Sequence, residues 1–274
     1  MKVGQIMTKD ELITIDKDQP VSTALELMER GHISALPVTD EDRLVGLCCM
    51  IDLVDRLGSI KAGKLTPANI HVSAVMEWKP KTVIPSTDVV DAARLLVERR
   101  ERAVVVVEDE KIVGILTNTH FVKRCLKIDN LFVHDLNQEE AQSIHPQDRV
   151  IHARQMILTT GLPGLPVIDK HEVIGLVTKR RLALGFAAFR KEVPAKHQSK
   201  RLREFLVANI LTRTNLTTHL EMTVGEAAEL LLRNQQHILP VMKEGYLEAL
   251  LIRRNLVELV GNKFQSLTRK EEEE

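Results

Sequence analysis

The chain has 274 residues, of which 44% are hydrophobic and 28% charged, and its 38 Lys and Arg residues balance its 38 Asp and Glu residues. This composition is typical of a globular protein with a buried core, and the length suffices for two ordinary domains. Zero net charge excludes a general attraction to nucleic acid or to an anionic membrane. The N-terminal residues lack the apolar run of a signal peptide, and no later run approaches the roughly 18 to 20 residues of a membrane span. We therefore expect a cytoplasmic protein without a membrane segment.

The predicted elements begin with a short strand at residues 12–15 and an amphipathic helix. Apolar residues at Val21, Ala24, Leu25 and Met28 follow the i, i+3, i+4, i+7 spacing of a helix with one buried face. Next come two strands at residues 35–38 and 44–49, which are separated by the polar turn TDEDR, and a second helix from about residue 50 to residue 57. The first part of the chain therefore predicts the order β-α-β-β-α.

This order of elements recurs three more times along the chain. The landmarks that repeat are a helix valine, a strand position, a glycine or alanine, and a residue in the second helix: Val21, Pro37, Gly46 and Asp52; Val89, Val105, Gly114 and His120; Val150, Pro166, Gly175 and Arg181; Val224, Pro240, Ala249 and Asn255. The first and last landmarks lie 31 residues apart in every copy, so the four repeats align without a gap. The third repeat interrupts its apolar helix face with Arg154. One such unit buries too little surface alone and should pair with a neighbour.

The repeats resemble cystathionine-beta-synthase (CBS) domains. The motifs that carry the resemblance are LPVTDEDRLVGLCCMID, VVVEDEKIVGILTNTH, LPVIDKHEVIGLVTKRR and, most divergent, LPVMKEGYLEALLIRRN. The resemblance implies an α+β fold of four repeats that pair into two Bateman modules, residues 1–127 and 128–264, and form a disc, followed by an acidic tail at 265–274. A chain with four such repeats is also similar in layout to the gamma subunit of AMP-activated protein kinase.

The junction between the second strand and the second helix has the chemistry of a nucleotide site. A Thr at this junction can cap the helix, whose free N–H groups favour an anion such as phosphate, and an acid three residues later can accept bonds from both ribose hydroxyls. A Thr-x-x-Asp pair can also be a helix cap and nothing more. The four junctions carry Cys49 and Asp52, Thr117 and His120, Thr178 and Arg181, and Ile252 and Asn255. Only the first retains the acid.

The resemblance also implies which residues complete each cleft. The cleft with Asp52 and Cys49 would be completed by the partner repeat near Met76–Glu77 and at Thr82, Val83, Arg102 and Ala103. The cleft with Thr117 and His120 would be completed by Thr8, Ile13, Ser34 and Ala35.

Two of the implied positions concern phosphate. Arg102 occupies the register position at which the kinase gamma subunit uses arginine to contact phosphate, and a guanidinium suits that role. A solvated arginine in the run ERRER is the alternative interpretation. His237 is the corresponding candidate in the second module, although a structural role is favoured there. Thr178 with Arg181 could hold an anion but lacks the ribose acid.

Residues 189–205 are locally basic. Six cations face two acids in this stretch: Arg190, Lys191, Lys196, Lys200, Arg201 and Arg203 against Glu192 and Glu204. We interpret it as a solvated linker, and because only Phe189 and Phe205 could stack on bases and neither is expected to be exposed, we predict no nucleic-acid contact.

The spacing of cysteine, histidine and acidic residues predicts no metal site. Cys48 and Cys49 are adjacent in a predicted strand and would point to opposite faces, and the chain lacks paired zinc spacings and a disulfide framework. Asp148 and His152 could share a helix face near His145, but two or three ligands favour a surface cluster. We expect buried thiols and no metal.

The sequence therefore predicts a non-catalytic regulatory module. It would bind AMP, ADP, ATP or S-adenosylmethionine between paired repeats, change their tilt and signal to a partner protein that the sequence does not identify. No nucleophile-base set or Walker loop points to an enzyme, and no cofactor is expected beyond the adenosine nucleotide as regulatory ligand. The alternative is a structural or nucleic-acid-binding scaffold with vestigial clefts. We expect a monomer or a homodimer.

Overall fold

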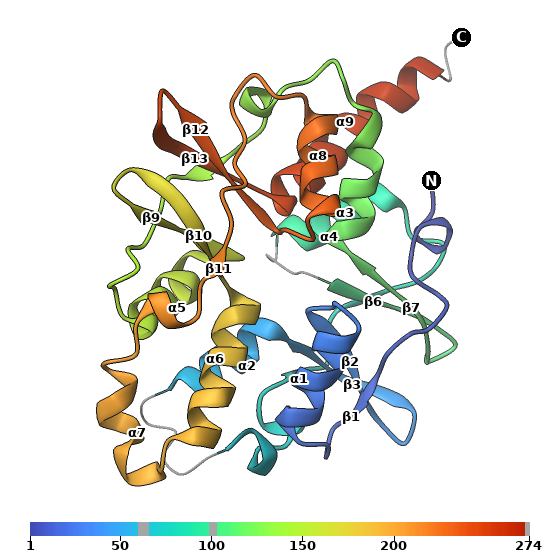
Figure 1. The fold of residues 1–274 in the computed structure, drawn as a ribbon. Coiled ribbons are helices and arrows are strands. Elements are labelled where there is room, and N and C mark those ends of the chain that lie inside the picture. Colours follow the sequence, from blue (N-terminus) through green and yellow to red (C-terminus); the bar gives the residue numbers. More distant parts are fainter. Residues whose placement is uncertain (60–65, 99–102, 272–274) are drawn as a thin grey trace. The chain divides into compact units, whose positions relative to one another are not determined.

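The computed structural model of the chain describes residues 1–59, 66–98 and 103–271, with side chains up to residue 262 (Figure 1). The described strands are β1 (Ile15–Asp16), β2 (Ala35–Asp40), β3 (Arg43–Cys49), β4 (Glu77–Trp78), β5 (Thr82–Val83), β6 (Ala103–Glu108), β7 (Lys111–Thr117), β8 (Glu139–Glu140), β9 (Gly164–Asp169), β10 (Glu172–Thr178), β11 (Thr212–Arg213), β12 (Ile238–Lys243) and β13 (Tyr246–Ile252). Each predicted strand pair is confirmed as an antiparallel hairpin.

The described helices are α1 (Val21–Arg30), α2 (Met50–Gly58), α3 (Val89–Glu98), α4 (Asn118–Val122), α5 (Val150–Thr160), α6 (Lys179–Glu192), α7 (Ala195–Leu202), α8 (Val224–Arg233) and α9 (Arg253–Glu271). Single 3-10 turns are η1 (Val3–Gln5), η3 (Pro67–Asn69), η4 (Val72–Ala74), η5 (Lys123–Lys127), η6 (Val133–Asp135) and η7 (Val207–Asn209). The four residues of the predicted stripe on α1 are all buried. The first predicted strand is shorter than expected, since β1 holds only Ile15 and Asp16.

Every hairpin turns through two residues in the left-handed region. In the first hairpin these are Glu41 and Asp42, with φ of 47° and 63°. The other three hairpins use the pairs Asp109 and Glu110, Lys170 and His171, and Glu244 and Gly245. Positive φ at both central residues matches the right-handed twist of the strands, so the short polar turn fixes the register.

The chain divides into two compact units, each built from two repeats that are not neighbours in sequence. One unit comprises residues 1–12, 81–141 and 216–274, and the other comprises residues 13–80 and 142–215. In the first unit α3, α8 and α9 enclose an apolar core around Phe121. In the second unit α2 packs against α6 (Figure 1). The predicted modules, residues 1–127 and 128–264, are pairs of repeats that would bind a ligand between them. The two contact-based units do not test that pairing, so the bounds of the modules stay a prediction.

Each hairpin is flanked by a short segment from its own repeat and a second one from the next or preceding repeat. In the first sheet, of order β1-β2-β3-β4, β1 pairs in parallel with β2, and β4, which precedes the helix of the second repeat, pairs with β3. The same arrangement covers the other hairpins through Thr8 on β7, β11 on β10 and β8 on β13. We call the stretch before each repeat's first helix its leading segment: residues 1–16, 67–83, 133–144 and 207–218.

Close approach of these leading segments explains the glycine of the repeated motif. A Cβ at Gly46 would lie 2.3 Å from the Met76 sulfur and 2.9 Å from the Glu77 carbonyl oxygen. A Cβ at Gly114 or at Gly175 would likewise lie 2.7 Å or less from the nearest atom of the leading segment that pairs with its strand. The fourth repeat has Ala249 instead of glycine. The leading segment that pairs with β13 is one residue longer than its counterparts, counted from the buried valine at its start to the first residue that pairs with the strand. The sequence thus accommodates the extra methyl group by lengthening the opposing chain.

Two arginines of the third repeat bind the carboxyl end of α2. Arg154 donates to the carbonyl of Val54 at 3.3 Å and to that of Asp55 at 2.9 Å, and it forms an ion pair with the Asp55 side chain. Arg190 donates to the Leu57 carbonyl at 3.0 Å and to the Ser59 carbonyl. The last carbonyls of a helix lack partners within the helix, so both side chains satisfy orphan acceptors and complement the dipole.

The expectation of a solvated linker at residues 189–205 is correct for five of the six cations, whose side chains are exposed, and wrong for Arg190 and for the part of the segment that forms a helix. Arg190 is only 3% exposed, and residues 195–202 form α7. Phe189 stacks on Phe205 with ring centroids 5.4 Å apart, which confirms that Phe189 is not exposed. The charge pattern missed the burial because it does not show that the Arg190 guanidinium donates to helix carbonyls and to Gln198, which replace bonds to water.

We predict that Arg190→Ala lowers the free energy of unfolding by about 2 to 4 kcal/mol, because it leaves several buried acceptors without a donor. Urea unfolding followed by circular dichroism measures this change. The adjacent Lys191→Ala, which alters an exposed side chain, should stay within about 0.5 kcal/mol of the parent. Equal unfolding midpoints for both variants would contradict the capping role of Arg190.

Candidate ligand sites at the strand-to-helix junctions

The junction of the first repeat presents a carboxylate at the start of α2. Cys49 is the N-cap, and its backbone N–H donates to Asp52 Oδ2 at 2.7 Å. Asp52 is partly buried in the first turn of the helix, where the dipole favours a negative charge. A carboxylate accepts about four hydrogen bonds in all, so this geometry fits an acceptor for hydroxyl groups.

The junction of the second repeat carries a histidine network. The Thr117 backbone N–H donates to His120 Nδ1 at 2.9 Å, and His120 Nε2 lies 3.0 Å from Thr8 Oγ1. An N–H group can only donate, so this bond requires an unprotonated Nδ1 and leaves the Nε2 proton for Thr8. Burial lowers the pKa of His120 below its ordinary value of 6.5, and Lys123 adds to the effect, whereas the Thr117 carbonyl opposes it.

The remaining junctions use their side chains to bind a leading segment. Thr178 Oγ1 accepts from the Arg181 backbone N–H at 3.2 Å, and Arg181 Nε donates to the Ile210 carbonyl at 2.8 Å. Asn255 Oδ1 accepts from the Ile252 N–H at 2.7 Å, and Asn255 Nδ2 donates to the carbonyl of Asn137 at 2.6 Å.

His120, Arg181 and Asn255 thus have a second role in common, since each contacts the segment that covers its sheet. Arg181 is held as a structural tie, which weakens the expectation that it binds a free anion with Thr178.

The structure brings together some of the predicted cleft residues. Thr8, Thr117 and His120 meet within one unit, as expected. In the other unit Ala35 pairs with Cys49, and the Ser34 carbonyl accepts from the N–H of Met50 at 2.9 Å, so both flank the Asp52 junction. Their place in the cleft with His120 stays a prediction.

Other predicted residues keep their roles as predictions. Thr82 and Val83 form β5, and Ala103 begins β6 with 2% of its surface exposed. These three belong to one unit and Asp52 to the other, so their meeting in a cleft stays a prediction. Ile13 is partly buried, and His237 is exposed and accepts from the Arg253 N–H at 3.3 Å. Arg102 lies outside the described residues.

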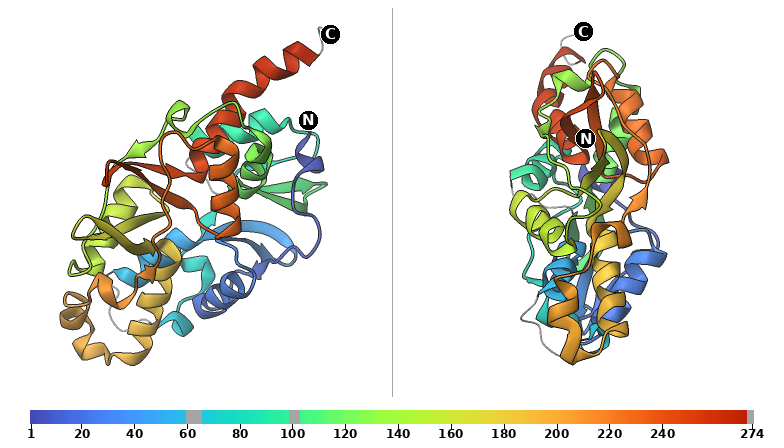
Figure 2. Two further views of the ribbon diagram at one scale, coloured as in Figure 1. Left: turned by 45° about the horizontal axis from the view of Figure 1, so that its top comes forward. Right: turned by 60° about the vertical axis from the view of Figure 1, so that its left-hand side comes forward.

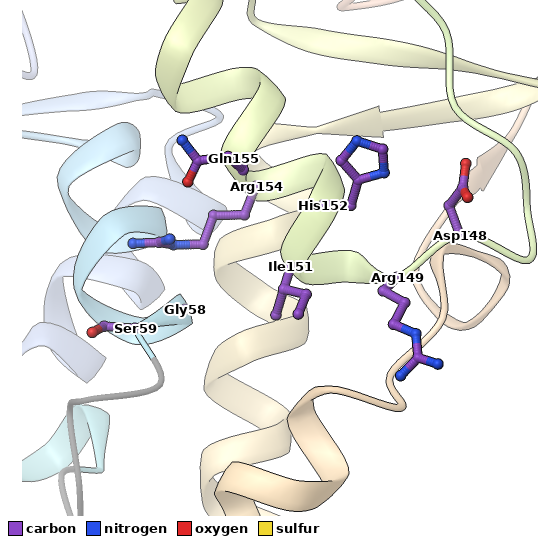
Figure 3. Close-up of a pocket in the computed structure, with 8 residues that line it drawn as sticks. All are labelled: Gly58, Ser59, Asp148, Arg149, Ile151, His152, Arg154 and Gln155. Carbon is purple, nitrogen blue, oxygen red and sulfur yellow. The ribbon is translucent and has the colours of Figure 1, made fainter.

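A pocket of about 540 Å³ lies at the opposite end of α2 from Asp52 (Figure 3). Its lining comprises Gly58, Ser59, Asp148, Arg149, Ile151, His152, Arg154 and Gln155. Figure 3 shows Arg154 reaching from α5 toward α2, whereas Arg149 and Asp148 lie on the side away from α2. Sequence reasoning missed this pocket, and the Arg154 that interrupts the apolar face of its helix was the available signal.

The histidine and acid near this pocket do not share a helix face. Asp148 precedes α5 and accepts from the His145 N–H at 2.8 Å, while His152 lies within the helix and is exposed. Among the described residues no group of three or more His, Cys, Asp or Glu side chains could hold a metal ion. The cysteines are buried thiols as predicted, and burial raises the pKa of Cys125 to about 12. No helix in the described part of the chain is long and apolar enough to cross a membrane.

The repeats that define these junctions match a known domain family. The CBS domain matches the chain at residues 3–59, 72–127, 133–187 and 207–262. The chain therefore belongs to the CBS-domain family, as the sequence motifs indicated.

Several known proteins are similar to this chain. The CBS domain-containing protein CBSX1 of Arabidopsis thaliana chloroplasts is 33% identical over 153 residues, which cover 46% of this chain and 64% of that protein. The chain thus spans a little under two thirds of that relative. Protein MJ1225 of Methanocaldococcus jannaschii, described as a candidate archaeal homologue of gamma-AMPK, has the same fold, with a TM-score of 0.81 and 19% identity over 94% of this chain and 99% of that one. A complex of CBSX2 with AMP is 35% identical over 46% of this chain and 96% of that one, with a TM-score of 0.41.

We predict that acidification destabilises the protein partly through His120. Its folded pKa is lowered, so the unfolded chain binds more protons near pH 6.5 and stability falls as the pH drops through that value. His120→Asn, which copies the residue of the fourth repeat, should show a smaller loss of unfolding free energy between pH 7.5 and 5.5. The exposed His197→Asn serves as a control and should follow the parent. Identical pH profiles for all three proteins would refute the role of His120.

Proposed function

We propose that this chain is a non-catalytic regulatory module that binds an adenosine-containing ligand at the junction of its first repeat. AMP, ADP, ATP and S-adenosylmethionine are the candidates. The observation that carries the proposal is the acid at the start of α2, where Cys49 orients the Asp52 carboxylate through a 2.7 Å bond. A carboxylate fixed in this way recognises a pair of vicinal hydroxyls, the feature that these ligands share in their ribose.

The other three junctions support a preference for the first. Their corresponding side chains, His120, Arg181 and Asn255, do not carry the negative charge that strengthens a bond from a hydroxyl. Ligand recognition by Asp52 therefore does not transfer to them by symmetry. AMP is the natural first probe, since CBSX2 is crystallised with it.

Regulation would follow if the ligand prefers one arrangement of the repeats. A ligand shifts an equilibrium only by its difference in affinity for the two states, so a ligand indifferent to them would transmit nothing. Asp52 opens α2, and the far end of α2 is bound by Arg154 and Arg190 of the third repeat. Movement of this helix on ligand binding would therefore displace the side chains of the third repeat that bind it.

The alternative function is a scaffold whose clefts are vestigial. The observation that favours a scaffold is that three junction side chains form hydrogen bonds with leading segments, because these side chains already stabilise the fold. A thermal-shift series with the four adenosine ligands separates the two functions, since a ligand that binds only the folded state raises the melting temperature. A scaffold would show no shift with any of them.

We predict that Asp52→Ala weakens adenosine-ligand binding by roughly 30- to 150-fold, on the order of 2 to 3 kcal/mol, because charge-assisted bonds to the ribose are lost. Isothermal titration calorimetry at one salt concentration measures the change. Asp52→Asn preserves an acceptor for the Cys49 N–H and tests the charge alone, while Thr178→Ala in the third repeat should bind within about twofold of the parent. If Asp52→Ala binds as tightly as the parent, the carboxylate is only a helix cap.

Arg102→Ala is expected to act on phosphate alone. It should reduce the discrimination among AMP, ADP and ATP and leave adenosine binding nearly unchanged, because a guanidinium contributes only where the ligand is charged. Competition against one fluorescent adenosine ligand gives the four affinities on a common scale. Unaltered ratios among the three nucleotides would assign Arg102 to the solvated surface.

A further inference from the structure

The third repeat carries an additional helix with a basic face. Between α6 and its next leading segment the chain forms α7, whereas only five residues separate η5 from η6 after the second repeat. Figure 2 shows α7 turning back beside the end of α6. The repeated fold does not require this helix, so its exposed residues are available for another role.

The helix α7 is held rigidly by its buried side. Gln198 is 4% exposed, its Nε2 donates to the carbonyls of Arg190 at 3.1 Å and Val193 at 2.8 Å, and its Oε1 accepts from Arg190 at 2.8 Å. Leu202 is 1% exposed, one turn later on the same face. Side chains that project from the opposite face therefore start from a fixed backbone, which lowers the entropy lost when a partner binds.

The opposite face presents exposed cations at helical spacing. Lys196 and Lys200 lie in α7 and Arg203 is its C-cap with helical backbone angles, so the three residues, at i, i+4 and i+7, form one stripe. Lys191 and Arg201 add exposed positive charge nearby. Within the part of the chain that the structure describes, none of these five side chains forms an ion pair.

Helix stability explains only part of the stripe. Cations near the carboxyl end, such as Lys200, complement the helix dipole, but Lys196 lies in the first turn, where a positive charge is unfavourable. The first turn of α7 also contains no acid. Lys196 is therefore the one cation of the stripe that its own helix does not favour.

We propose that the stripe formed by Lys196, Lys200 and Arg203 docks an acidic helical segment of a partner protein. A helix with Glu or Asp at i, i+4 and i+7 would set one carboxylate against each cation, and such complementarity steers association and fixes register. This interaction surface is independent of the adenosine ligand. It supplies a place at which a regulatory module of this kind could contact its partner.

The same surface is a poor fit for nucleic acid. The affinity for nucleic acid rises with the number of phosphates that Lys and Arg neutralise, and binding of single strands is strengthened by bases stacking on aromatic rings. The stripe offers three cations with two more beside it, and Glu192 and Glu204 flank them. Phe189 and Phe205 stack on each other, so their ring faces are already engaged.

The test measures binding of a labelled helical peptide that repeats glutamate at i, i+4 and i+7, by fluorescence anisotropy at low salt. The triple charge reversal Lys196→Glu, Lys200→Glu and Arg203→Glu should weaken binding on the order of tenfold or more. A matched control, Lys111→Glu, Lys127→Glu and Arg233→Glu, makes the same change in net charge at exposed cations elsewhere and should bind within about twofold of the parent. Circular dichroism confirms that both triple variants remain folded.

Three results would overturn the proposal. The control variant could lose as much affinity as the stripe variant, which would show a response to net charge. A peptide with the same composition in scrambled order could bind equally well, which would remove the helical register. A single-stranded DNA of equal charge could bind more tightly than the peptide, which would assign the surface to nucleic acid. Adenosine-ligand binding should be unaffected in the stripe variant, so failure here is distinct from failure of the Asp52 site.

Discussion

No repeat completes its own sheet, and the rest of the structure depends on this constraint. A two-stranded hairpin has exposed edges and buries little surface, so it is marginal alone. Here each hairpin gains a parallel contact from its own leading segment and an antiparallel contact from a different repeat. This pairing places the leading segment of another repeat beside the glycine of the motif, and a Cβ at Gly46 would collide with it. The strand-to-helix junctions lie at the end of these same strands, so the contact that completes the sheet also adjoins the candidate ligand site.

The junction residues show how different side chains occupy one position of the repeat. At the third residue of the second helix, Asn255 is 1% exposed and bonds to the backbone of Asn137, whereas Asp52 stands at the same register with a negative charge. A donor at this position stabilises the covering segment, and an acid can accept hydroxyl groups. Divergence among the repeats therefore changes the chemistry that this position offers, and the acid of the first repeat is the one that we propose binds a ligand.

Local patterns in the sequence were sufficient to predict the helices, turns and number of the repeats. Periodicity gave the buried face of α1, polar pairs such as Glu41 and Asp42 gave the turns, and the constant landmark spacing gave the number of copies, because these features depend on neighbouring residues. The motif also identified Asp52 and Cys49 as a pair. The roles of Arg154 and Arg190 could not be predicted in this way. Their partners on α2 lie about a hundred residues away in sequence, and a charge pattern carries no information on which carbonyls a guanidinium will meet.

The central claim is that an adenosine ligand is recognised by the acid of the first repeat. Crystals soaked with AMP, ADP, ATP and S-adenosylmethionine test it most directly, because electron density places the ligand without assuming a site. The account predicts a ligand whose ribose hydroxyls lie within hydrogen-bond distance of the Asp52 carboxylate. Ligand found only beside Arg181 or Asn255, with none at Asp52, would contradict it.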